Sequence, residues 1–411
     1  MPLQKNQVLT LRVERLSSDG SGVAHSPDGE AVFIPGAAPG DEARVRIVKD
    51  CKRYAFGILD EVLTPSPDRI PVDCAVAGPC GGCSLRHLDY AAELRAKQEN
   101  VADAFARIGG LDVPVLPIVG SPEVNRYRNK VQFPVGVDKS GKPCIGFYAG
   151  RTHRIVPCPD CRLQPGVLNE IGNALCAFFA EKGIQPYSEE TGRGLVRHIF
   201  LRRGAHSGQI MVCLVCTRAK LPSAEELCTR LKAQFAEITT ILLNVNAKNT
   251  NVILGTETHT LYGPGYIEDT LCGVPVQLGP LSFYQVNTLA AEQLYGIAAQ
   301  YAQLTPDDLL LDLYCGMGTI GLSMAAHCRE LIGVEIVPEA IESAKANAAR
   351  MGADVAAKSR FFCADAGQAA TRLAAEGLHP DIVMLDPPRK GCDEATLSAV
   401  VRMSPRRVVY V

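Results

Sequence analysis

The segment 308–322 constrains this chain more than any other, and it reads Asp308-Leu-Leu-Leu-Asp312-Leu-Tyr314-Cys-Gly316-Met-Gly318-Thr-Ile-Gly321-Leu. Its pattern predicts a short buried strand, a glycine turn and the start of a helix. Glycines permit positive φ, and without a Cβ a ligand can lie against bare backbone at the carboxyl edge of a parallel sheet. The segment therefore predicts an α/β fold with a nucleotide-type cofactor loop, although the glycine spacing alone also fits the dinucleotide fingerprint.

Three further predicted strands follow, and each ends in an acid: Glu335, Asp365 and Asp386. Glu335 lies about 20 residues beyond the first glycine, where a carboxylate commonly accepts hydrogen bonds from ribose hydroxyls. The carboxyl ends of parallel strands meet at one edge of a sheet, so these acids predict a shared pocket.

Two features favour S-adenosylmethionine over a nicotinamide cofactor. Asp312 stands four residues before Gly316, and the strand ending at Asp386 runs into a Pro-Pro-Arg-Lys-Gly turn. A carboxylate below the loop would repel a pyrophosphate, whereas a sulfonium with an α-amino group tolerates it. An NAD-dependent oxidoreductase and a βα turn without any ligand are the alternatives.

Short alternating strands fill the region from Val8 to Val62, separated by the turn pairs Asp19-Gly20, Asp28-Gly29, Pro35-Gly36 and Pro39-Gly40. Strands this short predict a closed barrel, which hides their edges. Phe33, Tyr54 and Phe56 could stack on nucleic-acid bases or fill the barrel. For Phe33, which stands between two apolar neighbours, we favour the barrel interior.

The chain contains 16 cysteines, and it shows neither a leader-like N-terminus nor a run of eighteen apolar residues. We therefore expect reduced thiols or metal ligands in a cytoplasmic protein without a membrane segment. Cys74, Cys80 and Cys83 surround a Gly-Gly pair that would let the backbone curl around a metal, with Cys158 and Cys161 as candidates for a fourth ligand. This spacing does not separate zinc from an iron–sulfur cluster. Cys213 and Cys216 lie in an apolar run and are expected in the core.

Basic residues concentrate in the middle of the chain, although the net charge is −2. Arg126, Arg128 and Lys130 would share one face of an extended strand and could follow a phosphate backbone, and Arg197 and Arg202 lie on a second basic strand. The alternative is that the two basic strings only form solvated surface and bind no nucleic acid. His198, beside the second string, is expected to be structural.

Four strings resemble the RNA uracil-C5 methyltransferases, in particular those acting on large-subunit ribosomal RNA: Asp-Leu-Tyr-Cys-Gly-Met-Gly-Thr-Ile-Gly, Val334-Glu335, Asp386-Pro-Pro-Arg-Lys-Gly391 and Phe283-Tyr-Gln285-Val-Asn287. The resemblance implies a TRAM barrel of the oligonucleotide-binding type at 1–62. A central α+β domain that holds the cluster cysteines and binds RNA follows at 63–265, and a Rossmann-like methyltransferase domain at 266–411.

The resemblance also implies the ligands. A [4Fe-4S] cluster would be held by Cys74, Cys80, Cys83 and Cys161, leaving Cys158 as an extra thiol. With the acids argued above, the expected cofactor residues are Gln285, Asp312, Tyr314, Gly316, Gly318, Glu335, Asp365 and Asp386. The expected partner is ribosomal RNA, or alternatively transfer RNA, bound by a monomer.

In the family, a cysteine thiolate adds to carbon 6 of uracil so that carbon 5 can take the methyl group, and a base then removes the proton. The nucleophile lies in a Ser-Cys-Asn-Pro-type loop after the fifth strand, and here the fifth strand is 406–411. We therefore expect a truncated member that lacks nucleophile and base, binds cofactor and RNA, and transfers little methyl. Cys315, Cys363 and Cys392 are poor substitutes. An iron–sulfur RNA-binding module without catalysis is the alternative function.

Overall fold

The computed structural model describes residues 3–150, 152–248 and 250–411. It divides into two compact units, one formed by Met1–Val124 and Gly146–Cys161, the other by Asn125–Ile145 and Arg162–Val411. None of the described helices is long and apolar enough to cross a membrane. The domain boundaries expected at 62 and 265 stay predictions.

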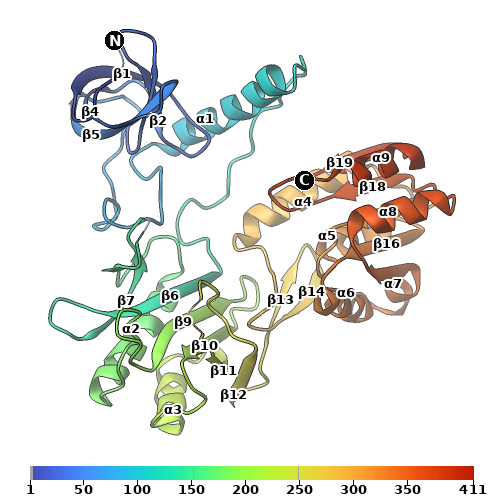
Figure 1. Cartoon of the computed structure of the whole chain (residues 1–411). Helices are drawn as coiled ribbons and strands as arrows, with labels where there is room; N and C mark the ends of the chain where they lie inside the picture. The colour runs from blue at the N-terminus through green and yellow to red at the C-terminus, as the bar shows by residue number, and fades with distance from the viewer. Residues whose placement is uncertain (1–2, 151, 249) are drawn as a thin grey trace. The chain divides into compact units, whose positions relative to one another are not determined.

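The first unit begins with a closed five-stranded barrel, with strand order β1-β2-β3-β5-β4 (Figure 1). Its strands are β1 Val8–Leu16, β2 Gly22–His25, β3 Ala31–Ile34, β4 Glu42–Asp50 and β5 Tyr54–Thr64. Val32, Ile34 and Ala55 are fully buried inside it. The barrel prediction is confirmed. The prediction for Phe33 is wrong, because alternation along β3 turns its ring outward while its two neighbours fill the core.

The rest of the first unit follows the barrel. It contains α1 Tyr90–Asp103, a π-helical turn Ala104–Ile108, the second half of β7 Pro143–Tyr148, and β8 Ile155–Pro157. Asp41, fully buried in a barrel turn, accepts hydrogen bonds from Ser66 N at 2.9 Å and from the Arg69 guanidinium. These bonds fasten the proline-rich segment after β5 to the barrel.

A mixed sheet forms one half of the second unit. Its strands, in spatial order, are β12 Glu257–Tyr262, β11 Ile238–Val245, β10 Ile210–Cys216, β9 Val196–Arg203, β6 Lys130–Val137 and the first three residues of β7. The helices of this region are α2 Gly166–Glu181 and α3 Ala224–Gln234. Every residue of β10 is buried, so Cys213 and Cys216 belong to the core, as predicted.

The other half of the second unit starts with the hairpin β13 Ile267–Leu271 and β14 Val274–Leu278 and the helix α4 Thr288–Ala302. A parallel sheet follows with strand order β17-β16-β15-β18-β19. Its strands are β15 Leu309–Leu313, β16 Glu330–Glu335, β17 Ser359–Cys363, β18 Ile382–Leu385 and β19 Arg407–Tyr410. Its helices are α5 Thr319–Met324, the 3-10 turn Ala325–His327, α6 Pro338–Met351, α7 Ala353–Lys358, α8 Ala366–Ala375 and α9 Glu394–Met403.

The order of this sheet reverses direction at β15. The chain moves from β15 through β16 to β17 on one side, then returns to β18 and β19 on the other. In open α/β sheets such a switch point leaves a crevice outside the carboxyl ends of the strands, where ligands bind. The predicted glycine turn follows β15, so the fold places it at this crevice.

Candidate active site

Asp312 lies near the carboxyl end of β15 and is 1% exposed. Its Oδ2 accepts a hydrogen bond from the backbone N of Gly321 at 3.0 Å, whereas Oδ1 has no partner among the described residues. Burial raises the pKa of Asp312 to about 7, opposed by the Gly321 bond and reinforced by repulsion from Asp386 and Glu335. A buried carboxylate with a vacant acceptor and acidic neighbours is complementary to a cation.

The glycine turn is built around this acid. Gly316 and Gly318 have φ of 55° and 80°, in the left-handed region that glycine adopts without strain. A Cβ on Gly321 would lie 2.8 Å from Asp312 Oδ2, so a side chain there cannot coexist with the observed hydrogen bond. A Cβ on Gly316 would meet nothing within 4 Å, so the backbone there faces open space. The turn is therefore packed tightly against Asp312 and open at Gly316.

Glu335 ends β16 beside the same turn. Its Oε2 accepts from the backbone N of Gly316 at 3.1 Å, and its Oε1 accepts from Val337 N at 2.9 Å. The first contact joins the acid at the end of β16 to the glycine turn that follows the neighbouring strand β15. Two of the predicted cofactor residues, Gly316 and Glu335, are thus in direct contact.

Asp386 follows β18 and is half-buried, and burial raises its pKa. It is close enough to Asp312 to raise the pKa of that acid as well. Asp365 follows β17, but it acts as the N-cap of α8, where its Oδ1 accepts from Gln368 N at 3.1 Å. The structure therefore brings Asp312, Glu335 and Asp386 together and gives Asp365 a capping role that the sequence analysis did not identify.

Tyr314 has a left-handed φ of 68°, and its hydroxyl lies 3.4 Å from Thr396 Oγ1 in α9. Its ring and Cys392 pack against the core that the sheet forms with α8 and α9. The side chain thus packs behind the turn, and the contact of its backbone with a cofactor stays a prediction.

Tyr295 is a site residue that the sequence analysis missed. It projects from α4, is 3% exposed, and its hydroxyl lies 3.4 Å from Thr319 Oγ1 at the start of α5. Burial raises the pKa of Tyr295 to about 12, with repulsion from Asp386 adding to the shift and hydrogen bonds from Thr319 and Gln285 opposing it. Tyr295 therefore connects Gln285 to the acids of the crevice. Tyr295 lies seven residues after Thr288, which is two helical turns along the same face of α4, and this spacing could have identified it from the sequence.

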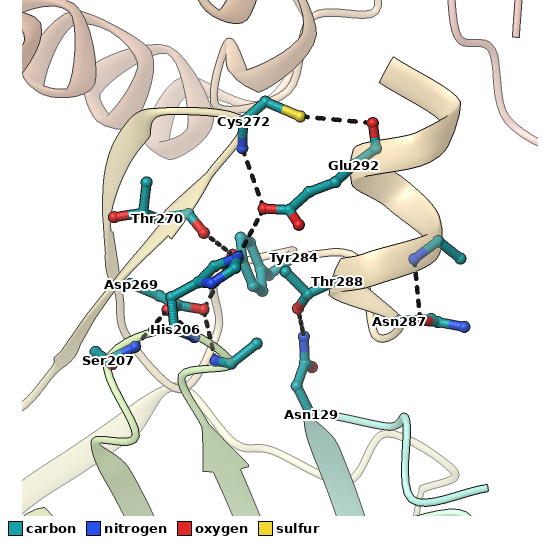
Figure 2. A network of polar contacts seen from close by, with 12 residues as sticks. Asn129, His206, Ser207, Asp269, Thr270, Cys272, Tyr284, Asn287, Thr288 and Glu292 are labelled. Atoms are coloured by element: carbon teal, nitrogen blue, oxygen red, sulfur yellow. Dashed lines mark hydrogen bonds and ion pairs between the residues drawn. The ribbon is translucent and has the colours of Figure 1, made fainter. Parts of the chain in front are cut away.

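A network of polar contacts holds the strand-to-helix segment that carries Gln285 (Figure 2). Asn129 Nδ2 donates to the Gln285 carbonyl at 2.7 Å and to Thr288 Oγ1 at 2.9 Å. On the other side, the buried carboxylate of Asp269 accepts from the Tyr284 hydroxyl at 3.1 Å. Asn129 and Asp269 therefore hold the Gln285 carbonyl and the side chains of Tyr284 and Thr288 on either side of it.

Asp269 is the centre of this network. Its carboxylate also accepts from the backbone N–H groups of Ala205, His206 and Ser207 at 2.8, 3.0 and 3.1 Å (Figure 2). The ring of His206 in turn lies 2.7 Å from Glu292 of α4. Because the loop after β9, the β13 hairpin and α4 all meet here, the network sets the position of the segment entering the crevice.

The predicted RNA-binding residues differ in their surroundings. The expected shared strand face does not form, because Arg126 has a left-handed φ of 59° and β6 begins only at Lys130. Arg128 and Lys130 are partly exposed, and burial together with Arg202 and Arg128 lowers the pKa of Lys130. Arg126 donates to the carbonyl of Gln164 at 3.1 Å.

Arg197 and Arg202 are 5% and 1% exposed. Arg197 Nη1 donates to the carbonyls of Asn246 and Lys248, and Arg202 donates to Gly279 O at 2.8 Å and Ser282 O at 2.7 Å. Both guanidinium groups are thus used inside the fold, and Arg202 anchors the loop before Gln285. Their roles as RNA ligands stay predictions. His198 is 6% exposed.

The predicted metal ligands lie near one another in the first unit. Burial raises the pKa of Cys80 and Cys83, and repulsion from Cys161 and Cys74 adds to it. Cys158 hydrogen-bonds Cys161. Across residues 3–150, 152–248 and 250–411, however, no group of three or more His, Cys, Asp or Glu side chains could hold a metal ion. The expected [4Fe-4S] cluster is therefore not supported by the described residues.

Comparison with known proteins adds a family. Residues 2–59 match the TRAM domain, and residues 224–411 match the tRNA (uracil-5-)-methyltransferase domain. An RNA methyltransferase of Halalkalibacterium halodurans is 42% identical over 411 residues, covering 100% of this chain and 89% of the relative. One from Oceanobacillus iheyensis is 39% identical and covers 100% and 88%.

Among solved structures, the Pyrococcus abyssi tRNA (uracil-54, C5)-methyltransferase in complex with S-adenosyl-L-homocysteine is similar in fold. Its TM-score is 0.75 with 24% identity, over 98% of this chain and 90% of that one. The expectation of a truncated, inactive chain is not borne out, because the relatives align with the whole of it. With a relative at 42% identity along its full length and both domain matches in agreement with the observed fold, the chain belongs to the TRAM-domain RNA methyltransferases of the uracil-5 family.

Proposed function

We propose that the crevice beside Gly316 binds S-adenosylmethionine and that the chain methylates carbon 5 of a uridine in RNA. The observation that supports this most is the meeting of Asp312, Glu335 and Asp386 around an open glycine turn, with one carboxylate oxygen of Asp312 lacking a partner among the described residues. Repulsion between these acids is relieved by a bound cation. When bound, S-adenosylmethionine supplies an electrophilic methyl group and carries both a sulfonium and an α-amino cation.

Each residue of the crevice has a separate task in this proposal. Glu335 accepts hydrogen bonds from the ribose hydroxyls while it holds Gly316 in place. Asp312 stays shielded from solvent and offsets the positive charge of S-adenosylmethionine. Gln285 binds the methionine end, positioned by Asn129 and Tyr295. Asp386, half-buried at the start of the Pro-Pro turn, contacts the cofactor or the target base.

No nucleophile is assigned. Carbon 5 of uracil requires activation by addition at carbon 6, which the family resemblance gives to a cysteine thiolate. Cys315 is unsuited to this role, because burial first, and then the neighbouring Asp312 and Glu335, raise the pKa of its thiol. Cys392 interacts with Tyr314 and packs against the core that the sheet forms with α8 and α9.

We propose large-subunit ribosomal RNA as the substrate, on the resemblance of the four sequence strings, with transfer RNA as the second candidate. Arg128 and Lys130 are proposed as contacts to the phosphate backbone, because both are partly exposed, whereas Arg197 and Arg202 are buried and Arg126 donates to the Gln164 carbonyl. Such contacts position an RNA without reading its sequence.

Calorimetric titration tests the cofactor site directly. S-adenosylmethionine is expected to bind more tightly than the neutral thioether S-adenosylhomocysteine, because only the former carries the sulfonium charge. Asp312→Asn, which keeps an acceptor for Gly321 N, should remove most of this preference. Equal affinity of wild type for both compounds would contradict the role of the acids.

Mass spectrometry of ribosomal and transfer RNA after incubation with the protein and S-adenosylmethionine identifies the methylated nucleotide and distinguishes the two candidate substrates.

A further inference from the structure

Tyr295 reaches the crevice from α4, and this helix is held in place over its first two turns. Thr288 Oγ1 accepts from the Asn129 amide at 2.9 Å, and one turn later Glu292 Oε1 lies 2.7 Å from Nε2 of His206 (Figure 2). These contacts fix the rotation of α4 about its own axis. The phenol of Tyr295, one turn further along, therefore has a fixed position.

The hydroxyl of Tyr295 joins the starts of two helices that border the crevice. Its oxygen lies 3.4 Å from Oγ1 of Thr319, which directly follows Gly318 of the glycine turn and begins α5. Both side chains are buried, with Tyr295 3% and Thr319 7% exposed. Tyr295 belongs to the same apolar core cluster as Met317 and Ile320. A phenylalanine would fill the same apolar volume, so packing alone does not require the hydroxyl.

The second partner of this hydroxyl is the side chain of Gln285. Burial raises the pKa of Tyr295 to about 12, and hydrogen bonds from Thr319 and Gln285 oppose the rise. A hydrogen bond that lowers the pKa of a phenol is donated to its oxygen, and the only donor of a glutamine side chain is its amide nitrogen. Nε2 of Gln285 therefore donates to Tyr295, which leaves Oε1 as the end of the amide that can accept.

The backbone of Gln285 is fixed independently of its side chain. Its carbonyl accepts from Asn129 Nδ2 at 2.7 Å, and the next carbonyl, that of Val286, accepts from Asn129 N at 2.8 Å. Because the two ends of a glutamine amide have almost the same shape and differ in polarity, an unrestrained amide can present either of them. With its main chain held by Asn129 and its Nε2 held by Tyr295, this amide presents one.

We propose that Tyr295 is a positioning residue that sets the Gln285 amide with Oε1 toward the cofactor, where it accepts a hydrogen bond from the α-ammonium group of S-adenosylmethionine. An ammonium group has donors and no acceptor, so an amide oxygen is complementary to it and an amide N–H repels it. The inference rests on the proposed cofactor site. It adds how the crevice recognises the amino-acid end of the ligand.

The test compares two ligands of the full chain by calorimetry. S-adenosylhomocysteine carries the α-ammonium, whereas 5′-methylthioadenosine keeps the adenosine and the sulfur and lacks the amino-acid end. Tyr295→Phe, which retains the ring, is expected to bind S-adenosylhomocysteine about 3- to 10-fold more weakly, as loss of one hydrogen bond does. It should bind 5′-methylthioadenosine like wild type. Tyr301→Phe is the matched control, because Tyr301 lies on the same helix and is 52% exposed.

A double-mutant cycle shows whether Tyr295 acts through Gln285. Gln285→Met removes both polar ends of the amide at similar size, and it should weaken S-adenosylhomocysteine at least as much as Tyr295→Phe does. Adding Tyr295→Phe to Gln285→Met should then cause no further loss. A full additional loss in the double variant would mean that the hydroxyl acts without the amide, and it would overturn the proposal.

Two other outcomes would overturn it as well. Unchanged affinity of Tyr295→Phe for S-adenosylhomocysteine would show that the hydroxyl does not set the amide. An equal loss for both ligands would show damage to the crevice as a whole, and thermal unfolding without ligand measures such damage separately. Failure of the wild type to bind S-adenosylmethionine would instead contradict the proposed function, on which the inference rests.

Discussion

The side-chain amide of Asn129 donates a hydrogen bond of 2.7 Å to the backbone carbonyl of Gln285, across 156 positions of sequence. Asn129 is 4% exposed and directly precedes β6 of the central sheet, and Gln285 lies just before α4. The same amide also bonds Thr288 at the start of α4. A residue of the central sheet therefore fixes the backbone on which a proposed cofactor ligand is mounted.

Asn129→Ala is expected to lower S-adenosylmethionine affinity about tenfold or more while the chain stays folded, because Gln285 loses its anchor. Calorimetry measures the affinity and thermal unfolding measures the stability. The control is Asn246→Ala, another buried asparagine, whose amide holds the carbonyls of Val252 and Ile253. That change should cost similar stability and leave the affinity unaltered. Equal loss of affinity in both variants would show that Asn129 acts only through general stability.

The raised pKa of Asp312, about 7, predicts a pH dependence of stability. Below pH 4 the carboxyl is protonated in both the folded and the unfolded chain, so it adds no pH dependence to the free energy of unfolding there. Between about 4 and 7 the unfolded chain loses this proton first, so the free energy of unfolding falls as pH rises, by on the order of a few kcal/mol, and levels off above 7. Thermal unfolding between these limits should show the fall in wild type and a smaller one in Asp312→Asn.

The affinity for S-adenosylmethionine should change with pH in the opposite direction to the stability. Ionised Asp312 attracts a cation, so S-adenosylmethionine affinity is expected to increase as pH rises through about 7. In Asp312→Asn the affinity should be lower and nearly independent of pH in this range. A pH profile unchanged by the substitution would assign the titration to Glu335 or Asp386.

Two glycine substitutions separate packing from binding. Gly321→Ala places a Cβ 2.8 Å from Asp312 Oδ2 and Leu331 Cδ1, so the free energy of unfolding should fall by about 1–3 kcal/mol. Gly316→Ala meets no atom within 4 Å and should cost only about 1 kcal/mol for its positive φ. Its methyl group points into the open crevice, however, so S-adenosylmethionine affinity should drop strongly. Denaturant titration and calorimetry on both variants test this reversal.

Asp269→Ala removes the acceptor of three backbone N–H groups and of the Tyr284 hydroxyl. Because the carboxylate is 4% exposed, we expect a loss of about 3 kcal/mol or more in the free energy of unfolding. The adjacent Glu268→Ala, an exposed side chain on the same strand, is the control and should change little. Similar unfolding midpoints for the two variants would contradict the central position of Asp269.

Lys130→Ala and Arg128→Ala test the proposed phosphate contacts. Each should weaken ribosomal RNA fragments of different sequence by the same factor and reduce the slope of log affinity against log salt by about 1. Lys139→Ala, an exposed lysine in the turn after β6, is the control. A slope unaltered in both variants would exclude direct contact with phosphate.

Much of the fold was predictable because its signals are local. The apolar runs, the turn pairs of the barrel and the glycines after β15 each specify conformation within a few residues. The three acids of the crevice were predictable for a related reason, since parallel strands must bring their ends to one edge. Asn129 and Asp269 could not be identified this way, because their partners lie far away in sequence and nothing in the periodicity selects them.

Two residues show where local reasoning fails. Phe33 is predicted inside the barrel because its neighbours are apolar. Side chains alternate along β3, however, and it is Val32 and Ile34 that face the core, so Phe33 points outward. Arg202 is predicted to contact RNA, and local reasoning does not reveal that its guanidinium also donates to two carbonyl oxygens of the loop before Gln285. In both cases tertiary packing decides which face of a strand is buried.

The polypeptide passes between its two units at Val124, at Ile145 and again at Cys161, the second time in the middle of β7. A fragment ending at residue 124 would therefore lack β8, the carbonyl of Tyr148 that accepts from Gly81, and two of the five clustered thiols. The N-terminal unit cannot be exchanged between proteins as one contiguous cassette. Only the barrel itself, contiguous from β1 to β5, has the connectivity of a transferable module.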